Sequence, residues 1–202
     1  MFLIIAFTLA VIAAVFTIVP PAEGLGYLVR IIYFHVPTAL MAVVAFATSA
    51  FYAASYLKTH NLEKDLMSAK AAKIGFISVF FSTVSGAIFS KLTWGAYWNW
   101  DPRQTTIFIL ILIYGAYLTL RMAVTENKTR AKVSAIYSLL SVLTVPFLVF
   151  ILPRMYFSLH PSIITSKGID MDSTMLIVLV AAILDSILIF AYLMKKRGID
   201  IK

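Results

Sequence analysis

The chain of 202 residues contains no cysteine. That absence excludes disulfide bonds, cysteine-ligated zinc sites, iron–sulfur clusters and thiol redox chemistry. Histidine is also scarce, with three residues, so each histidine can be considered individually. We find no internal repeat, no low-complexity stretch and no segment with the composition of a soluble domain. The sequence therefore predicts a single domain over residues 1–202.

Apolar residues are abundant: they make up 61% of the chain, and its mean hydropathy is +0.94. Soluble domains are closer to about 45–50% apolar, and one soluble core could not bury this much apolar surface. The solvent must therefore be the lipid bilayer. The net charge of +8 would suggest nucleic acid as a partner for a soluble protein. In a membrane protein the distribution of basic residues between loops matters more, and we expect no nucleic acid partner.

Six stretches are long and apolar enough for a transmembrane helix, which needs about 20 residues. They cover residues 2–19, 35–57, 74–90, 105–120, 133–152 and 175–194. The first stretch lacks the basic segment of a secretory signal and runs too long for one, so we expect a retained span. The predicted fold is an all-α integral membrane bundle of six transmembrane helices.

The basic residues predict which side of the membrane each loop faces. Twelve of the 17 lysines and arginines lie between spans two and three, between spans four and five, or in the tail after span six. Positive charge stays in the cytoplasm, so both termini are expected there. His35, His160 and all three tryptophans then fall on the external side, whereas His60 is cytoplasmic.

The tryptophans form one segment between spans three and four, where residues 94–101 read Trp-Gly-Ala-Tyr-Trp-Asn-Trp-Asp. One interpretation is an aromatic belt at headgroup depth, but a belt spreads its tryptophans over many helix ends. The clustering favours an aromatic platform for a large flat apolar ligand, and Gly95 would allow close backbone approach. If the segment is helical, Trp94 and Trp98 share one face.

Residues 101–104 read Asp-Pro-Arg-Gln and are typical of a helix start. Asp101 is expected as the N-cap, Pro102 as the first helical residue, and Gln104 as the residue that completes a capping box. A capping role for Asp101 leaves room for a second role in shaping the platform.

The segment from Trp94 to Asp101 fits the WGxxWxWD signature of the haem-handling proteins of cytochrome c maturation. Within that superfamily the chain resembles the cytochrome c maturation protein C (CcmC) family. The resemblance also rests on the continuation Asp-Pro-Arg-Gln-Thr at 101–105, on Arg-Ile-Ile-Tyr-Phe-His-Val-Pro at 30–37, and on the His160 loop before a final span. The length of the chain and its six predicted spans also agree with that family, so the resemblance covers nearly the whole chain.

The resemblance implies that His35 and His160 are the two axial iron ligands of a non-covalently bound haem b. Imidazole suits iron, and two axial ligands must reach opposite faces of one ring from the same side of the membrane. A lone histidine at a span end is more often an interfacial residue; the pair and the tryptophan segment favour ligation. Arg30 and Arg103 would pair with the haem propionates or, alternatively, anchor lipid phosphates.

The same resemblance implies a function and a set of partners. The protein would hold haem at the outer face of the inner membrane and deliver it to the periplasmic haem chaperone CcmE. The ABC transporter subunits CcmA and CcmB and the small membrane protein CcmD would assist, and the chain would not itself be an enzyme. The alternative is a cytochrome c synthase, although such proteins are larger and also use histidines inside the membrane. A respiratory b-type cytochrome would not explain the tryptophans.

Several residues keep two interpretations. Asp185 lies in the middle of span six, where a carboxyl group is costly and marks a candidate functional site. It could instead bond a nearby Ser or Tyr while protonated, or face a partner subunit. Tyr33, Tyr97 and Tyr156 either line the site or belong to an aromatic belt.

Overall fold

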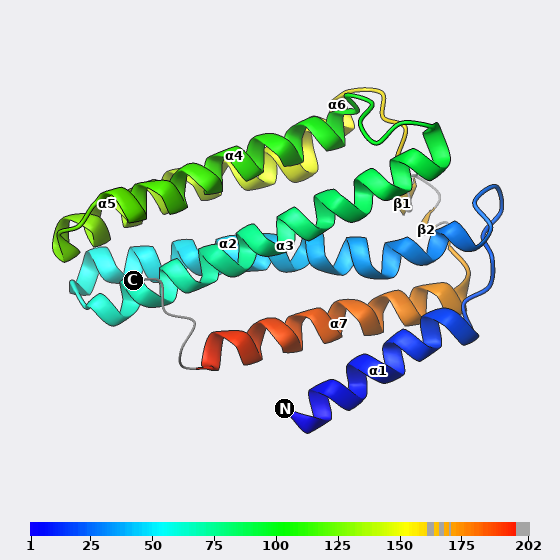
Figure 1. Ribbon diagram of the computed structural model, residues 1–202, viewed down its shortest axis with the longest axis horizontal. Coiled ribbons are helices and arrows are strands. Elements are labelled where there is room, and N and C mark those ends of the chain that lie inside the picture. Colours follow the sequence, from blue (N-terminus) through cyan, green and yellow to red (C-terminus); the bar gives the residue numbers. More distant parts are fainter. Residues whose placement is uncertain (161–163, 166–167, 170, 197–202) are drawn as a thin grey trace.

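The computed structural model describes residues 1–160, 164–165, 168–169 and 171–196. It is helical apart from one short antiparallel hairpin (Figure 1). The elements in chain order are α1 (Phe2–Thr17), η1 (Tyr27–Ile31), α2 (Ile32–Thr59), α3 (Leu62–Trp94), α4 (Pro102–Ala123), α5 (Asn127–Pro146), η2 (Phe147–Ile151), α6 (Leu152–Met155), β1 (Ile164–Thr165), β2 (Gly168–Ile169) and α7 (Ser173–Lys195).

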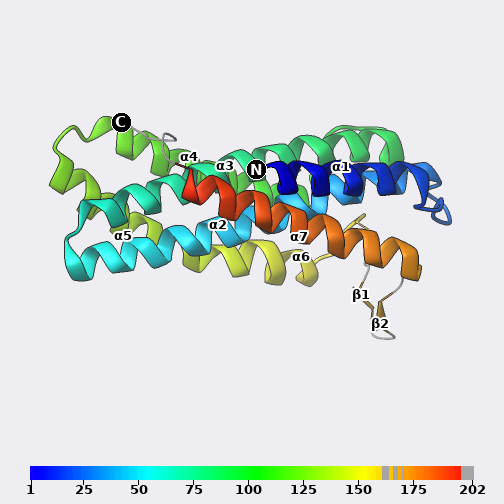
Figure 2. The same ribbon diagram turned by 90° about the horizontal axis from the view of Figure 1, so that it is seen from below.

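The long helices run side by side along the longest axis of the molecule (Figures 1 and 2). Among the described residues, five helical segments are long and apolar enough to cross a membrane: Tyr27–Thr59, Leu62–Trp94, Pro102–Ala123, Asn127–Met155 and Ser173–Lys195. The chain is therefore an all-helical membrane protein, as predicted. Helix α1 is apolar but has only 16 residues, and it packs against α7 at the edge of the bundle (Figure 2).

The connection between α2 and α3 is much shorter than the sequence suggested. Helix α2 ends at His60, whose backbone is left-handed (φ 53°), and Asn61 begins α3 by accepting a hydrogen bond from the Glu63 N–H at 2.8 Å. Lys64 and Lys73 therefore lie on α3 rather than in a polar loop over residues 58–73. Good helix formers fill this stretch, so the helix extends well beyond its apolar part.

At its other end α3 also continues further than its apolar stretch. It includes Trp94 and stops at Gly95, which has φ +83° and donates its N–H to the Lys91 carbonyl. Gly95 thus forms a left-handed helix cap, and open space lies beside it. Trp98 lies beyond this cap, so the helical condition under which Trp94 and Trp98 would share a face does not hold.

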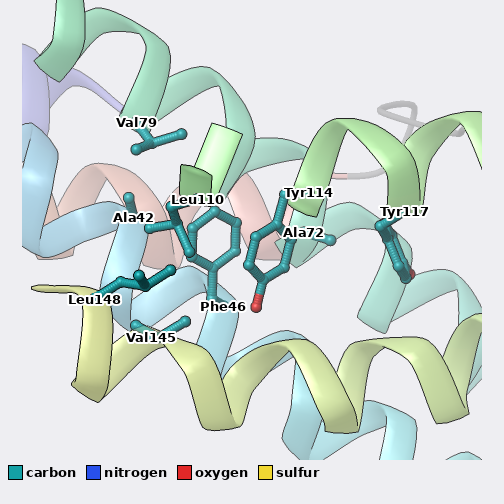
Figure 3. Close-up of a cluster of buried hydrophobic side chains, with 9 residues drawn as sticks. All are labelled: Ala42, Phe46, Ala72, Val79, Leu110, Tyr114, Tyr117, Val145 and Leu148. Carbon is teal, nitrogen blue, oxygen red and sulfur yellow. The ribbon is translucent and has the colours of Figure 1, made fainter. Parts of the chain in front are cut away.

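The centre of the bundle is a packed apolar cluster contributed by four long helices and η2 (Figure 3). The rings of Phe46 and Tyr114 are stacked, with centroids 3.4 Å apart. The cluster consists of Ala42, Phe46, Ala72, Val79, Leu110, Tyr114, Tyr117, Val145 and Leu148.

A buried ion pair joins α3 to α4. The Arg121 guanidinium donates to both carboxylate oxygens of Asp65, at 2.6 and 2.9 Å, and both residues are at most 3% exposed. Arg121 is one of the twelve basic residues that predicted the cytoplasmic side, where it was expected in a loop. Its charge is instead neutralised inside the bundle.

We expect Asp65→Asn to destabilise the fold strongly, because the buried Arg121 would lose its counter-charge. Breaking one partner of a buried pair typically costs about 3–5 kcal/mol. The measurement is the thermal unfolding midpoint in detergent micelles. Replacing both residues, as Asp65→Leu with Arg121→Met, should recover most of the loss. An Asp65→Asn protein that unfolds at the parental temperature would contradict this account.

Candidate functional site

Two adjoining cavities lie at the end of the bundle that carries residues 94–101, which we call the tryptophan end. Together with the open solvent at their mouths, they contain about 680 and about 580 Å³ of empty space. Both are lined by His35, Gly86, Arg103 and His160. Because they share these four residues, we treat them as one two-lobed cavity with both histidines in its wall.

His35 reaches the cavity from the first turn of α2. Its Nδ1 lies 2.9 Å from the Ser82 carbonyl oxygen and 3.1 Å from the Ser85 hydroxyl, both on α3. A carbonyl oxygen only accepts, so Nδ1 carries the proton and the Nε2 lone pair is left free. A Cβ at residue 86 would lie 3.0 Å from His35 Cε1, so glycine gives the imidazole the room it occupies.

His160 reaches the cavity from the loop that follows α6. Its Nδ1 lies 3.2 Å from an Asp101 carboxylate oxygen, and the Trp94 ring meets it edge-on with centroids 5.2 Å apart. An ionised carboxylate also only accepts, so the same tautomer results and Nε2 again carries the lone pair. Burial lowers the pKa of His160, although Asp101 acts in the opposite direction. The lowered pKa favours the neutral imidazole that a metal requires.

Asp101 caps α4, as predicted, and it also holds the His160 loop. Its carboxylate accepts the Arg103 N–H at 2.9 Å, the Leu159 N–H at 2.7 Å and the Ser158 hydroxyl at 2.9 Å, besides its contact with His160. Burial alone would raise the pKa of Asp101. Hydrogen bonds from Leu159, Arg103 and Ser158 outweigh it and hold the pKa below its usual value.

Gln104 does not complete the expected capping box. Its amide oxygen accepts the Asn99 N–H at 2.9 Å, and its amide nitrogen donates to the Tyr97 carbonyl. The left-handed backbone of Trp100 (φ 55°) lies between residues 99 and 101. The amide that faces Gln104 is consequently that of Asn99, not that of Asp101. Gln104 therefore fixes the tryptophan segment from inside, where it is 6% exposed.

The three tryptophans occupy different places. Trp98 lines the larger lobe and meets Trp100 and Phe108 edge-on, each with centroids 5.9 Å apart. Trp94 contacts His160, and Trp100 is 76% exposed. The indoles therefore do not form one flat surface, and Trp98 is the one that lines the cavity.

The two candidate arginines, Arg30 and Arg103, also lie in different surroundings. Arg103 lines both lobes, and its Nε is buried with no hydrogen-bond partner among the described residues. Arg30 lines neither lobe; its guanidinium carbon lies 4.2 Å from the centroid of the Tyr27 ring and 5.6 Å from that of Phe16. Of these two arginines, only Arg103 lies in the wall of the cavity.

The structure also shows the surroundings of the four residues that kept two interpretations, Asp185, Tyr33, Tyr97 and Tyr156. Asp185 accepts the Thr8 hydroxyl at 2.9 Å and so joins α7 to α1, where a Ser or Tyr partner was considered. Tyr33 donates to the Met175 carbonyl at 3.1 Å. Tyr97 and Tyr156 are each 61% exposed.

Ser82, Ser85, Gly86 and Ser158 were not among the predicted site residues. Ser85 and Gly86 follow Ser82 by three and four residues, so both lie on the same side of α3 as Ser82. That spacing of small residues in an apolar helix was a usable signal for close packing. Ser158 lies in an irregular loop and offered no comparable signal.

The chain is similar to known proteins over most of its length. A family model described as heme exporter protein C matches residues 1–199. The putative cytochrome c biosynthesis ccmC-like mitochondrial protein of Marchantia polymorpha is 33% identical over 156 residues, which are 77% of this chain and 64% of that protein. Heme exporter protein C of Bradyrhizobium diazoefficiens is 27% identical over 170 residues, or 83% and 64% of the two chains. That of Escherichia coli K12 is 30% identical over 126 residues, or 62% and 51%. The matched part of the chain spans only 51–64% of the length of these relatives.

Proposed function

The chain belongs to the heme exporter protein C family, and on that premise we propose that it holds haem b non-covalently for cytochrome c maturation. His35 and His160 are the proposed axial ligands. The observation that carries the proposal is their matched arrangement: each imidazole commits Nδ1 to an acceptor, and both line the same cavity. A histidine that ligates a metal usually donates its other ring nitrogen in this way.

The residues around the cavity fit haem. Two imidazoles supply only two ligands, so the metal must bring the others, as haem iron does with its porphyrin nitrogens. Trp98 offers an aromatic contact, and Arg103 can pair with a propionate. The haem supplies the reactive chemistry, while this chain binds and orients it without acting as an enzyme.

The proposed topology has six spans, with α1 as the first, and both termini in the cytoplasm of an inner-membrane protein. The excess of basic residues at the end opposite the tryptophan end supports it. Lys167, Arg197 and Lys202 entered that count but lie outside the described residues. Arg121 is paired within the bundle and contributes less to sidedness than a free loop charge.

The packed centre of the bundle supports delivery on the periplasmic side. One turn inward from cavity residues Ala39, Ser82 and Ile107 lie Ala42, Val79 and Leu110, none of them more than 1% exposed. These three belong to the apolar cluster of Figure 3. We infer that this cluster separates the cavity from the opposite end of the bundle. Haem held by His35 and His160 would therefore leave from the tryptophan end. By family resemblance the acceptor is the periplasmic haem chaperone CcmE, with CcmA, CcmB and CcmD as further partners.

We expect the purified protein to carry haem with a six-coordinate, low-spin visible spectrum. His35→Ala or His160→Ala should lose that spectrum and most of the haem. His60→Asn is the matched control, because His60 ends α2 at the opposite end and asparagine tolerates its left-handed backbone. Equal haem content in all three variants would refute the proposed ligand pair.

Sidedness can be tested with single cysteines in a chain that has none of its own. Tyr97→Cys lies in the exposed part of the tryptophan segment, and Lys58→Cys lies near the end of α2. With an impermeant thiol reagent added to intact cells, we expect labelling at residue 97 and protection at residue 58. The reverse pattern would place the cavity on the cytoplasmic side.

The tryptophans should differ in what they contribute. We expect Trp98→Ala to weaken haem retention, because stacking on an aromatic face contributes roughly 1–3 kcal/mol for nucleobases, which are similarly flat. Trp98→Phe should retain most of it. Trp100→Ala should keep the haem but slow its transfer, since that side chain is exposed. The measurement is covalently haem-loaded CcmE per unit of inserted protein. Parental loading by both alanine variants would leave the segment as an aromatic belt.

A further inference from the structure

The two histidines of the cavity have chemically different partners. His35 donates to a neutral backbone carbonyl, that of Ser82 at 2.9 Å. His160 donates to the carboxylate of Asp101, whose side chain is only 1% exposed. A carboxylate draws the proton from the ring nitrogen more strongly than a carbonyl does, which makes the opposite nitrogen more electron-rich. The cavity therefore presents two unlike imidazoles.

We propose that Asp101 is a positioning residue that makes His160 the more strongly donating of the two ligands, so that haem in this cavity is ligated asymmetrically. The inference rests on the proposed function, because it concerns how the two histidines would share one iron. It assigns Asp101 a different role from direct haem contact. The carboxylate lines neither lobe of the cavity, and protein donors surround it.

The surroundings of Asp101 allow little freedom of orientation. The Arg103 N–H fixes one oxygen from α4, and the Leu159 N–H fixes the other from the loop that carries His160. The Ser158 hydroxyl bridges both oxygens and also accepts the His160 backbone N–H at 3.2 Å. These bonds fix the orientation in which the Asp101 carboxylate accepts the His160 ring N–H.

The same bonds link His160 to the tryptophan segment. Asp101 directly follows Trp100, whose left-handed backbone conformation is unfavourable for a bulky residue. A displacement of the exposed Trp100 would therefore act on the residue that orients His160. Helix α3 holds His35 through Ser82 independently of this link. The tryptophan segment could thus influence His160, whereas His35 would be held independently of it.

The test compares reduction potentials of the haem-loaded full chain. Asp101→Asn removes the negative charge but keeps a good N-cap. Asp101→Ser also removes the charge and keeps a good N-cap, with a hydroxyl in place of the amide. Loss of the charged acceptor should weaken ferric relative to ferrous haem binding by about tenfold, the lower limit for such outer partners. For a one-electron couple that ratio raises the midpoint potential by about 59 mV. The spectrum should stay low-spin.

Asp172→Asn is the matched control. Asp172 also caps a helix, accepting the N–H groups of Thr174 at 2.8 Å and Met175 at 3.2 Å, but it contacts neither histidine. The midpoint potential of the haem-loaded Asp172→Asn protein should equal that of the parent. A second reading uses the haem-free protein: ¹⁵N spectra should show His160 protonated at Nδ1 in the parent and as a mixture of tautomers in Asp101→Asn, with His35 unchanged.

The outcomes separate the inference from the function on which it rests. If the parent binds no haem, the proposed function is wrong. If the parent binds haem and both Asp101 variants keep the parental potential, or shift it no more than Asp172→Asn, Asp101 does not tune His160 and the inference is overturned.

Discussion

A buried carboxylate must have each of its hydrogen bonds satisfied, and at Asp101 those bonds determine where the start of α4 and the His160 loop meet. Removing an ionised group from water costs several kcal/mol unless donors replace the lost hydration. The start of α4, the loop of residues 158–160 and the His160 ring supply those donors. The cavity has its present shape because these segments converge on one side chain. Without Asp101 the described part of the His160 loop, residues 158–160, would lose these hydrogen bonds to the start of α4.

The opposing wall depends on close helix packing rather than on charge. Gly86 and Ser82 let α3 approach α2 closely enough for the His35 ring to reach a backbone carbonyl. Inside a membrane small residues permit such approach, and backbone polar groups must be satisfied within the protein. His35 therefore sits on rigid scaffold, whereas His160 sits on a loop held by side-chain bonds. Beneath both, the apolar cluster around Phe46 and Tyr114 closes the bundle.

The sequence was sufficient for the features that depend on composition or local pattern. Apolar content predicted a helical membrane protein, and Asp-Pro at 101–102 predicted the start of α4. The WGxxWxWD signature predicted the family that the comparisons confirmed. Helix ends were less predictable, because α3 extends at both ends beyond its predicted apolar stretch, through segments that carry lysines. The approach of His160 to Asp101, 59 residues apart, arises from tertiary packing that no local pattern encodes.

Some side-chain roles could not be derived for the same reason. No local pattern indicates that Arg121 is paired, because its partner Asp65 lies 56 residues away in the chain. Gln104 has the spacing of a capping box, yet the left-handed backbone at Trp100 gives it a different partner. Arg30 and Arg103 occupy comparable positions in the motifs, but only Arg103 lines the cavity. Local propensity describes what a residue can do, and tertiary contacts decide which option is taken.

The central claim is that one iron is held between His35 and His160 in the two-lobed cavity. The most direct measurement is an experimental structure of the haem-loaded protein by electron cryomicroscopy, at a resolution that separates the ring from its axial ligands. The account predicts one haem with iron bound to Nε2 of both histidines, while both Nδ1 atoms keep their bonds to Ser82 and Asp101. Haem bound outside this cavity, or ligated through Nδ1 of either histidine, would contradict it.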